Sequence, residues 1–355
     1  MSLTELYGHA ALRQRLEQSI EAGTLPASLL FHGARGVGKQ RLALWLAQRL
    51  LCTGEDPPCE KCTSCRYVRA LTHPDLHWVF PRPRPRDSDP DLQQVRDDYA
   101  EAIAERAAAN GLYAPPSGSE GIYVATVRSL VQRASMAPAM GSRKIFIVGD
   151  AERMVPQEGA DMAANAFLKL LEEPPADTTI ILTSSEPGAL LPTIRSRVIA
   201  VRVPLVSDAD VKAFLSDPAV KASFGKERGG ATDRARAASG APGRLFSGES
   251  NARATIAARK IIDAAVGDKR WQRYAAALNQ GAASARGAFS DTLDALLELL
   301  GERARDSLHR NDDAAAAAAS KSVDAVLRAQ TRATSNVSPQ LITAKLIREL
   351  SATLR

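Results

Sequence analysis

The sequence predicts an α/β fold, in which a parallel sheet carries a phosphate-binding loop and is followed by a helical region. Three observations support this prediction. An apolar run at 29–31 leads directly into a near-complete nucleotide-binding loop. Short apolar runs then alternate with helical patterns to about residue 204, which is typical of a parallel sheet covered on both faces. From about residue 205 the strand-like patterns give way to helical ones.

The octet from Gly33 to Gln40 matches the phosphate-loop pattern G-x-x-x-x-G-K-[ST] at every position except the last. Gly33, Gly36 and Gly38 would let backbone N–H groups close around phosphates, which Lys39 would also reach. Gln40 stands where a hydroxyl would ligate Mg²⁺, and an amide is a poor substitute because Mg²⁺ prefers compact oxygen ligands. The octet therefore predicts a nucleotide-binding fold without Mg²⁺ and argues against hydrolysis, while binding of ATP or ADP stays open.

All four cysteines fall within residues 52–65: Cys52, Cys59, Cys62 and Cys65. Two overlapping C-x-x-C units and one upstream cysteine offer the tetrahedral sulfur set that Zn²⁺ prefers, with no open position for catalysis. We therefore predict a structural zinc module. The alternatives are free or redox-active thiols and an iron–sulfur cluster. His73 and His77 lie nearby, but four sulfurs already complete the shell, so both are interpreted as structural.

A polar segment over 81–121 interrupts the alternating pattern. It opens with three Pro-Arg repeats at 81–86, which predict an extended, solvated start. Its middle, 91–109, is typical of a charged surface helix. An alternative interpretation of the arginines is an arm that contacts phosphates.

The strand predicted at 145–148 is followed by Asp150, in the place of the acid that holds Mg²⁺ in a working ATPase. Ala151 occupies the usual place of the glutamate that polarises water, and Glu152 comes one residue later. One residue of displacement turns a side chain by about 100° on a helix, or to the opposite face of a strand. We therefore expect Glu152 not to take over that role, which adds a second defect to the one at Gln40.

Composition sets broad limits on the function. The 355 residues predict two or three domains, and a formal net charge of +6 is compatible with either a polyanionic partner or a scattered solvated surface. The sequence lacks a long apolar run and the pattern of a secretion signal, so we expect a cytoplasmic protein without a membrane partner.

The order of the motifs resembles the clamp-loader family of bacterial DNA polymerase III within the AAA+ group, in particular its delta prime subunits. Four linked features carry the resemblance: the loop with the cysteine module behind it, Thr-His-Pro-Asp at 72–75, the run 165–175 that ends in LLEEPP, and Ser-Arg-Val at 196–198. The resemblance covers about residues 1–250, and later residues match in helical character only.

The resemblance implies a domain organisation and residue roles. An AAA+ domain would span 1–204, a small helical lid 205–248 and an oligomeric collar 250–355. Arg197 would be an arginine finger inserted into the ATP site of a neighbouring subunit, although Val198 replaces the cysteine of the family motif. The alternative for Arg197 is a surface ion pair. Ser184 or Ser185 would lie in the sensor-1 region, and Arg244 resembles the sensor-2 arginine.

The implied function is a non-hydrolysing stator of the clamp loader, which assembles with gamma or tau and delta subunits. The assembly opens the sliding clamp and places it on primed DNA, so this chain would meet the clamp indirectly. An active motor subunit of the gamma/tau type is the alternative, and it predicts Ser or Thr at position 40 and an acid at 151. A purely structural, zinc-bearing DNA-binding protein would leave the strand order and Arg197 unexplained.

Overall fold

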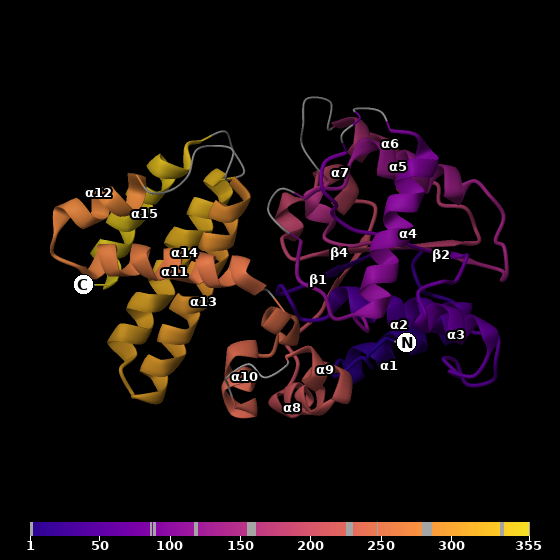
Figure 1. The fold of residues 1–355 in the computed structure, drawn as a ribbon, viewed down its shortest axis with the longest axis horizontal. Coiled ribbons are helices and arrows are strands. Elements are labelled where there is room, and N and C mark those ends of the chain that lie inside the picture. Colours follow the sequence, from indigo (N-terminus) through magenta and orange to yellow (C-terminus); the bar gives the residue numbers. More distant parts are fainter. Residues whose placement is uncertain are drawn as a thin grey trace. The chain divides into compact units, whose positions relative to one another are not determined.

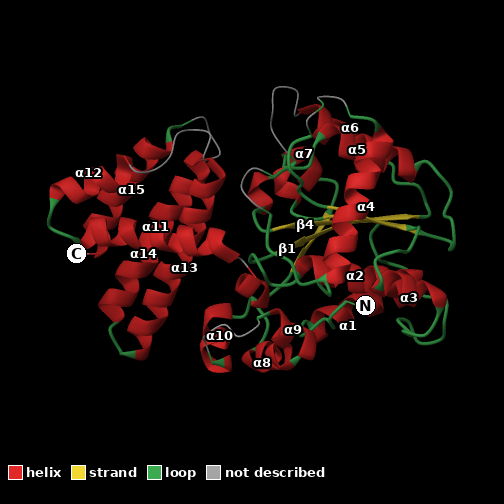
Figure 2. Ribbon diagram, viewed as in Figure 1, coloured by secondary structure: helices red, strands yellow, loops and turns green. Residues whose placement is uncertain are grey.

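The computed structural model describes residues 3–85, 87, 90–116, 120–154, 161–224, 230–246, 248–278, 286–333 and 337–354. It divides the chain into two compact units, one extending to Phe246 and the other beginning at Ser247 (Figure 1). Strands lie in the first unit, and the described part of the second is helical (Figure 2).

The first unit is built on a five-stranded parallel sheet with the strand order β2-β3-β4-β1-β5. Its strands are β1 (Ser28–His32), β2 (Leu76–Val79), β3 (Lys144–Val148), β4 (Thr178–Ser184) and β5 (Ile199–Arg202). Every residue of β3 and β4 is buried because helices cover both faces of the sheet. The predicted parallel-sheet architecture is thereby confirmed.

Seven helices accompany this sheet in the described part of the first 204 residues. They are α1 (Ala10–Glu21), α2 (Lys39–Leu51), α3 (Thr63–Arg69), α4 (Leu92–Ala108), α5 (Val124–Ala134), α6 (Asp161–Glu172) and α7 (Pro192–Arg195). Short 3₁₀ turns form η1 (Ala151–Arg153) and η2 (Pro187–Ala189). The apolar core includes Leu42 and Leu46 of α2, which are both fully buried, together with Phe31, Phe146 and Phe167.

The polar segment over 81–121 contributes to this core as well as to the surface. Its predicted surface helix forms as α4, but one face of α4 is buried through Val95, Tyr99 and Ala102. The Tyr99 hydroxyl donates to the Phe80 carbonyl oxygen at 2.7 Å. An antiparallel bridge between Arg82 and Gly121 closes the segment at its base. The segment is therefore an insertion that packs one face of α4 against the core, while Pro83 and Arg84 at its start are exposed.

The first unit ends in a small helical subdomain made of α8 (Asp208–Ser216), α9 (Pro218–Ser223), α10 (Ala231–Ala238) and the 3₁₀ turn η3 (Pro242–Phe246). Val211, Phe214 and Val220 form its own apolar cluster. The Ser207 side chain caps α8 by accepting from the Asp210 N–H at 3.1 Å. This subdomain falls within the stretch for which the sequence predicts a lid.

The second unit consists of α11 (Gly248–Val266), α12 (Arg270–Leu278), α13 (Arg286–His309), α14 (Asp313–Ala333) and α15 (Pro339–Leu354). Its core has Ile261, Leu296, Val326 and Leu346 as members. Both observations agree with the helical C-terminal region that the sequence predicts. Among the described residues of the whole chain, none of the helices is long and apolar enough to cross a membrane.

Candidate functional site

The phosphate-type loop joins β1 to α2, as its sequence predicts. Its glycines allow a close approach to the helical subdomain. Gly36 has φ +79°, and a Cβ added there would lie 2.7 Å from the backbone nitrogen of Arg244. The Gly243 N–H donates to the Gly36 carbonyl oxygen at 2.8 Å. The structure thus brings Arg244, the predicted sensor-2 residue, against this loop.

The Lys39 side chain folds back onto its own loop. Its Nζ donates at 2.9 Å to each of three oxygens, the carbonyls of Gly33 and Ala34 and the hydroxyl of Ser185. Burial lowers the pKa of Lys39, and the nearby charges of Asp150 and Glu152 oppose that shift. An ammonium has three donors, so all are used here. A phosphate would have to displace one of these contacts in order to bind Lys39.

Gln40 links the loop directly to Asp150. The amide nitrogen Nε2 donates to Asp150 Oδ2 at 2.9 Å. The amide oxygen Oε1 accepts from Trp78 Nε1 at 3.0 Å and from the Tyr113 hydroxyl at 3.1 Å. The side chain is 9% exposed. A hydrogen bond therefore joins the two positions between which a hydrolytic site of this type would hold Mg²⁺.

Three residues around Gln40 are not predicted from the sequence. Gly149 leaves room for the amide, since a Cβ there would lie 2.5 Å from Gln40 Oε1. Tyr113 reaches the site from the 81–121 segment. Arg106, also from that segment, places its guanidinium carbon 3.2 Å from the centroid of Phe80 and 3.8 Å from that of Tyr113. Tyr113 could have been found from the sequence, because it is an aromatic residue in a polar stretch.

We expect Gln40→Leu to destabilise the first unit by about 2–4 kcal/mol, because it leaves the buried donor of Trp78 and the acceptor of Asp150 without their partner. Chemical denaturation of the purified chain measures this loss. Gln18→Leu is the matched control, since Gln18 is exposed on α1 and should change stability by less than about 0.5 kcal/mol. An equal loss of stability in the two variants would contradict a stabilising role of the hydrogen bonds around Gln40.

The carboxyl group of Glu152 points into the interior of the protein. Its Oε1 accepts from the Ser185 N–H at 2.9 Å, and its Oε2 is buried with no hydrogen-bond partner among the described residues. Burial, followed by the charge of Asp150, raises the pKa of Glu152 to about 7. Ala151 lies in the usual place of the catalytic glutamate and is buried. The carboxyl group of Glu152 therefore links the η1 turn to the residue that follows β4.

The raised pKa of Glu152 predicts a pH dependence. A carboxyl whose pKa is higher in the folded state stabilises the fold when protonated, and that stabilisation is lost as pH rises from about 4.5 to about 7. We expect Glu152→Gln to remove this loss, because glutamine does not titrate. As pH rises from 5 to 8, the free energy of unfolding of the variant should therefore increase by up to about 3 kcal/mol relative to that of the parent. Unfolding free energies measured across that range test this, and parallel profiles would refute it.

Arg197 lies just beyond α7 and contacts the end of α6. Its Nε and Nη2 both donate to Glu172 Oε1, at 3.0 and 2.5 Å. Its Nη1 donates to the Thr193 carbonyl at 2.9 Å and to Ser196 Oγ at 3.2 Å. The two charged side chains are 31% and 45% exposed. Within this chain Arg197 thus forms the surface ion pair that the sequence offered as its alternative role, and it stays accessible.

The two serines proposed for the sensor-1 region differ in their contacts. Ser184 ends β4 fully buried, and its Oγ accepts from the Glu186 N–H at 3.0 Å. Ser185 accepts from Lys39 through Oγ. Ser185 is therefore the serine that faces the loop. His9 is a further loop neighbour that sequence reasoning missed, with its Nε2 2.9 Å from the Val37 carbonyl oxygen.

The four cysteines form one cluster between α2 and α3. Their Sγ atoms all lie within 4.8 Å of one another, and those of Cys52 and Cys62 are 3.9 Å apart. A tetrahedron with metal–sulfur bonds of about 2.3 Å has sulfur–sulfur edges of about 3.8 Å. Burial opposes ionisation of Cys62, but backbone N–H groups, that of Cys65 first, lower its pKa to about 5. The cluster can hold a metal ion.

The Thr-His-Pro-Asp motif at 72–75 has a structural role. Asp75 is buried and accepts from the N–H groups of Ala139, Met140 and Gly141. Its own N–H donates to His73 Nδ1 at 3.1 Å. Burial raises the pKa of Asp75, but these backbone donors outweigh it and lower the pKa overall. The motif therefore ties the start of β2 to the turn before β3.

Comparisons with known proteins agree with these features. Residues 8–206 match the family model described as DNA polymerase III, delta subunit. DNA polymerase III subunit delta′ of Bacillus subtilis is 31% identical over 183 residues, which is 51% of this chain and 43% of that protein. The Escherichia coli subunit delta′ is 30% identical over 186 residues, covering 52% of this chain and 44% of the relative. The matched part thus spans less than half the length of these relatives.

Two further similarities involve gamma-type proteins. DNA polymerase III subunit gamma/tau of Mycobacterium tuberculosis is 30% identical over 218 residues, covering 61% of this chain and 31% of that protein. A solved gamma subunit-related protein from Thermotoga maritima aligns over 96% of this chain and 99% of its own, with 16% identity and a TM-score of 0.38.

Proposed function

The chain belongs to the DNA polymerase III delta-subunit family, and we propose that it acts as a non-hydrolysing stator subunit of the DNA polymerase III clamp loader. The observation that carries this proposal is the hydrogen bond from Gln40 to Asp150. In an ATPase of this type, Mg²⁺ lies between the loop and the acid. Here the neutral amide of Gln40 occupies that position.

The surroundings of that bond support the absence of hydrolysis. A cation beside the Gln40 nitrogen would meet N–H dipoles pointing toward it, and rotating the amide would break the contacts of Oε1 with Trp78 and Tyr113. Lys39 has its donors engaged by the loop and Ser185. Ala151 brings no carboxylate to polarise water. The side chains of Lys39 and Gln40 are thus satisfied without nucleotide or metal.

Arg197 would act on a different site, that of a neighbouring subunit. Its guanidinium is partly exposed and is held by Glu172 and the Thr193 carbonyl. A guanidinium so oriented can neutralise charge that grows on a transferred phosphoryl group. We propose gamma or tau and delta subunits as the partners, with the sliding clamp and primed DNA met through the assembly in the cytoplasm.

The remaining assignments follow the same proposal. Zn²⁺ is the proposed structural cofactor of the module at 52–65, where Cys52, Cys59, Cys62 and Cys65 would hold it as thiolates. The AAA+ domain would occupy 1–204, the lid 205–248 and the oligomerising collar 250–355. Zinc would supply a fixed tetrahedral crosslink between α2 and α3, and it would take no part in chemistry.

An active motor of the gamma/tau type is the second candidate, and the alignment with gamma/tau over 61% of this chain favours it. Gln40 and Ala151 oppose it, because that candidate needs a hydroxyl and a carboxylate at these positions. The stator therefore fits the site better.

Co-purification tests the proposed assembly. The full chain, expressed with the gamma/tau and delta subunits of its own organism, should elute with both as one complex in size-exclusion chromatography. Elution of this chain alone, under conditions in which gamma/tau and delta bind each other, would refute membership of the loader.

A further inference from the structure

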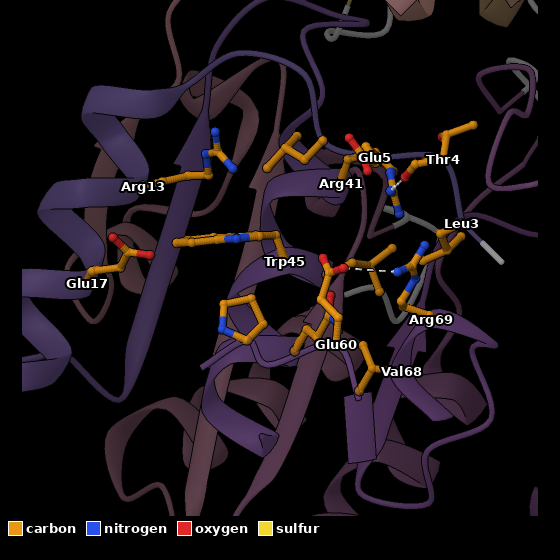
Figure 3. Close-up of a pocket in the computed structure, with 14 residues that line it drawn as sticks. Leu3, Thr4, Glu5, Arg13, Glu17, Arg41, Trp45, Glu60, Val68 and Arg69 are labelled. Carbon is orange, nitrogen blue, oxygen red and sulfur yellow. Dashed lines mark hydrogen bonds and ion pairs between the residues drawn. The ribbon is translucent and has the colours of Figure 1, made fainter. Parts of the chain in front are cut away.

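A cavity of about 310 Å³ lies away from the phosphate-type loop, among the N-terminal segment, α1, α2 and α3. None of the residues 33–40 lines it. Arg13, Trp45 and Arg69 enter it from three different helices (Figure 3). Its apolar wall is shared by several elements and comprises Leu3, Leu6, Leu44, Pro58 and Val68. Its size is near the lower end of small-molecule sites.

The interior of this cavity carries more unpaired positive than negative charge. Arg69 pairs with Glu60 at 3.3 Å, and Glu17 lies 3.9 Å from Arg49. The third acid of the lining, Glu5, is exposed to solvent. Among the described residues, Arg13 and Arg41 have no carboxylate partner within ion-pair distance.

Arg41 shows the consequence of that imbalance. Its Nη2 donates to the Thr4 carbonyl oxygen, as Figure 3 shows, and not to an acid. Burial lowers the pKa of Arg41 to about 10, and the charge of Arg69 adds to the shift. An anion in the cavity would relieve both effects, because it would offset the lost hydration and the repulsion between the two guanidinium groups.

One buried donor at this cavity also lacks an acceptor. Arg13 Nε has no hydrogen-bond partner among the described residues. Buried polar atoms are satisfied in the great majority of cases, so this donor indicates a missing acceptor. The Arg13 guanidinium carbon lies 5.8 Å from the centroid of the Trp45 ring. Cationic donors and a flat aromatic surface are therefore adjacent.

We propose that this cavity binds a small aromatic oxyanion, that is, a flat ring that carries a phosphate or a carboxylate. The anionic oxygens accept from Arg13 and Arg41, and the ring packs against the Trp45 indole. Guanidinium groups suit both oxyanions, because their planar donors match the geometry of phosphate and carboxylate. The site is independent of the phosphate-type loop and of the proposed stator function.

Isothermal titration calorimetry on the full chain tests this proposal with three probes: deoxyadenosine monophosphate, benzoate and adenosine. We expect saturable binding of at least one of the two anions and none of adenosine; which anion binds identifies the oxyanion. Arg13→Ala should weaken binding at least tenfold. Arg15→Ala, which removes the same charge from an exposed position of α1, should leave it unchanged.

Absence of saturable binding by both anions would overturn the proposal, as would equal affinity for adenosine or equal effects of the two arginine variants. Lys39→Ala should retain binding, and its loss there would move the ligand to the phosphate-type loop and refute this site. If Arg13→Ala fails to fold, Trp45→Leu removes the aromatic surface of the cavity and should weaken binding in its place.

Discussion

Replacing Arg197 with alanine is expected to leave assembly of the loader intact and to lower ATP hydrolysis at the neighbouring site about 10³-fold or more. The reason is electrostatic, since a guanidinium stabilises charge on the phosphoryl group only in the transition state. Arg197 is suited to this because Glu172, Thr193 and Ser196 hold it in one orientation while its side chain stays partly exposed. The measurement is the ATPase rate of the reconstituted loader.

Two variants control that experiment. Arg195→Ala removes a charge from an exposed residue of the same short helix and should leave the rate unchanged. Glu172→Gln weakens the ion pair but keeps the guanidinium, so it should lower the rate much less than Arg197→Ala does. An unchanged rate for Arg197→Ala in a fully assembled complex would remove the finger role and leave Arg197 as the surface ion pair seen in this chain.

The second large effect is expected at the cysteine cluster. Metal analysis of the purified chain should return about one zinc per molecule, and Cys62→Ser should abolish this and destabilise the first unit by several kcal/mol. The cause is that binding of the metal is linked to folding, because the four sulfurs that would hold it come together in the folded chain. Thermal unfolding with and without a chelator measures the loss.

Glu55→Ala, a change at an exposed position in the same module, should leave metal content and stability unaffected. A metal-free protein that unfolds at the same temperature with or without chelator would contradict the zinc assignment. Iron in place of zinc would instead favour the iron–sulfur alternative.

The sequence predicted the parts of the site that depend on local patterns. The glycine spacing of 33–40 placed the loop between β1 and α2, and an apolar run placed Asp150 directly after β3. The cysteine spacing similarly anticipated a compact cluster. Each of these features follows from residues close together in the chain, for which turn geometry and strand order determine the position.

The contacts that close the site could not be predicted in this way. Gln40 meets Trp78 and Tyr113, which lie 38 and 73 residues further along the chain. Arg106 packs on aromatic rings from β2 and from its own insertion. Such partners are set by tertiary packing, and the charged composition of 91–109 favoured a solvated helix. What looked like a defect at position 40 is thus an anchored side chain.

We propose that this chain retains the nucleotide-binding fold but does not hydrolyse ATP. Steady-state ATPase activity of the purified chain alone, with Mg²⁺ and saturating ATP, tests this directly. We expect no turnover above background, and no difference between the parent and Lys39→Ala. Mg²⁺-dependent turnover that Lys39→Ala abolishes would show that the loop is functional and would refute the non-hydrolysing role.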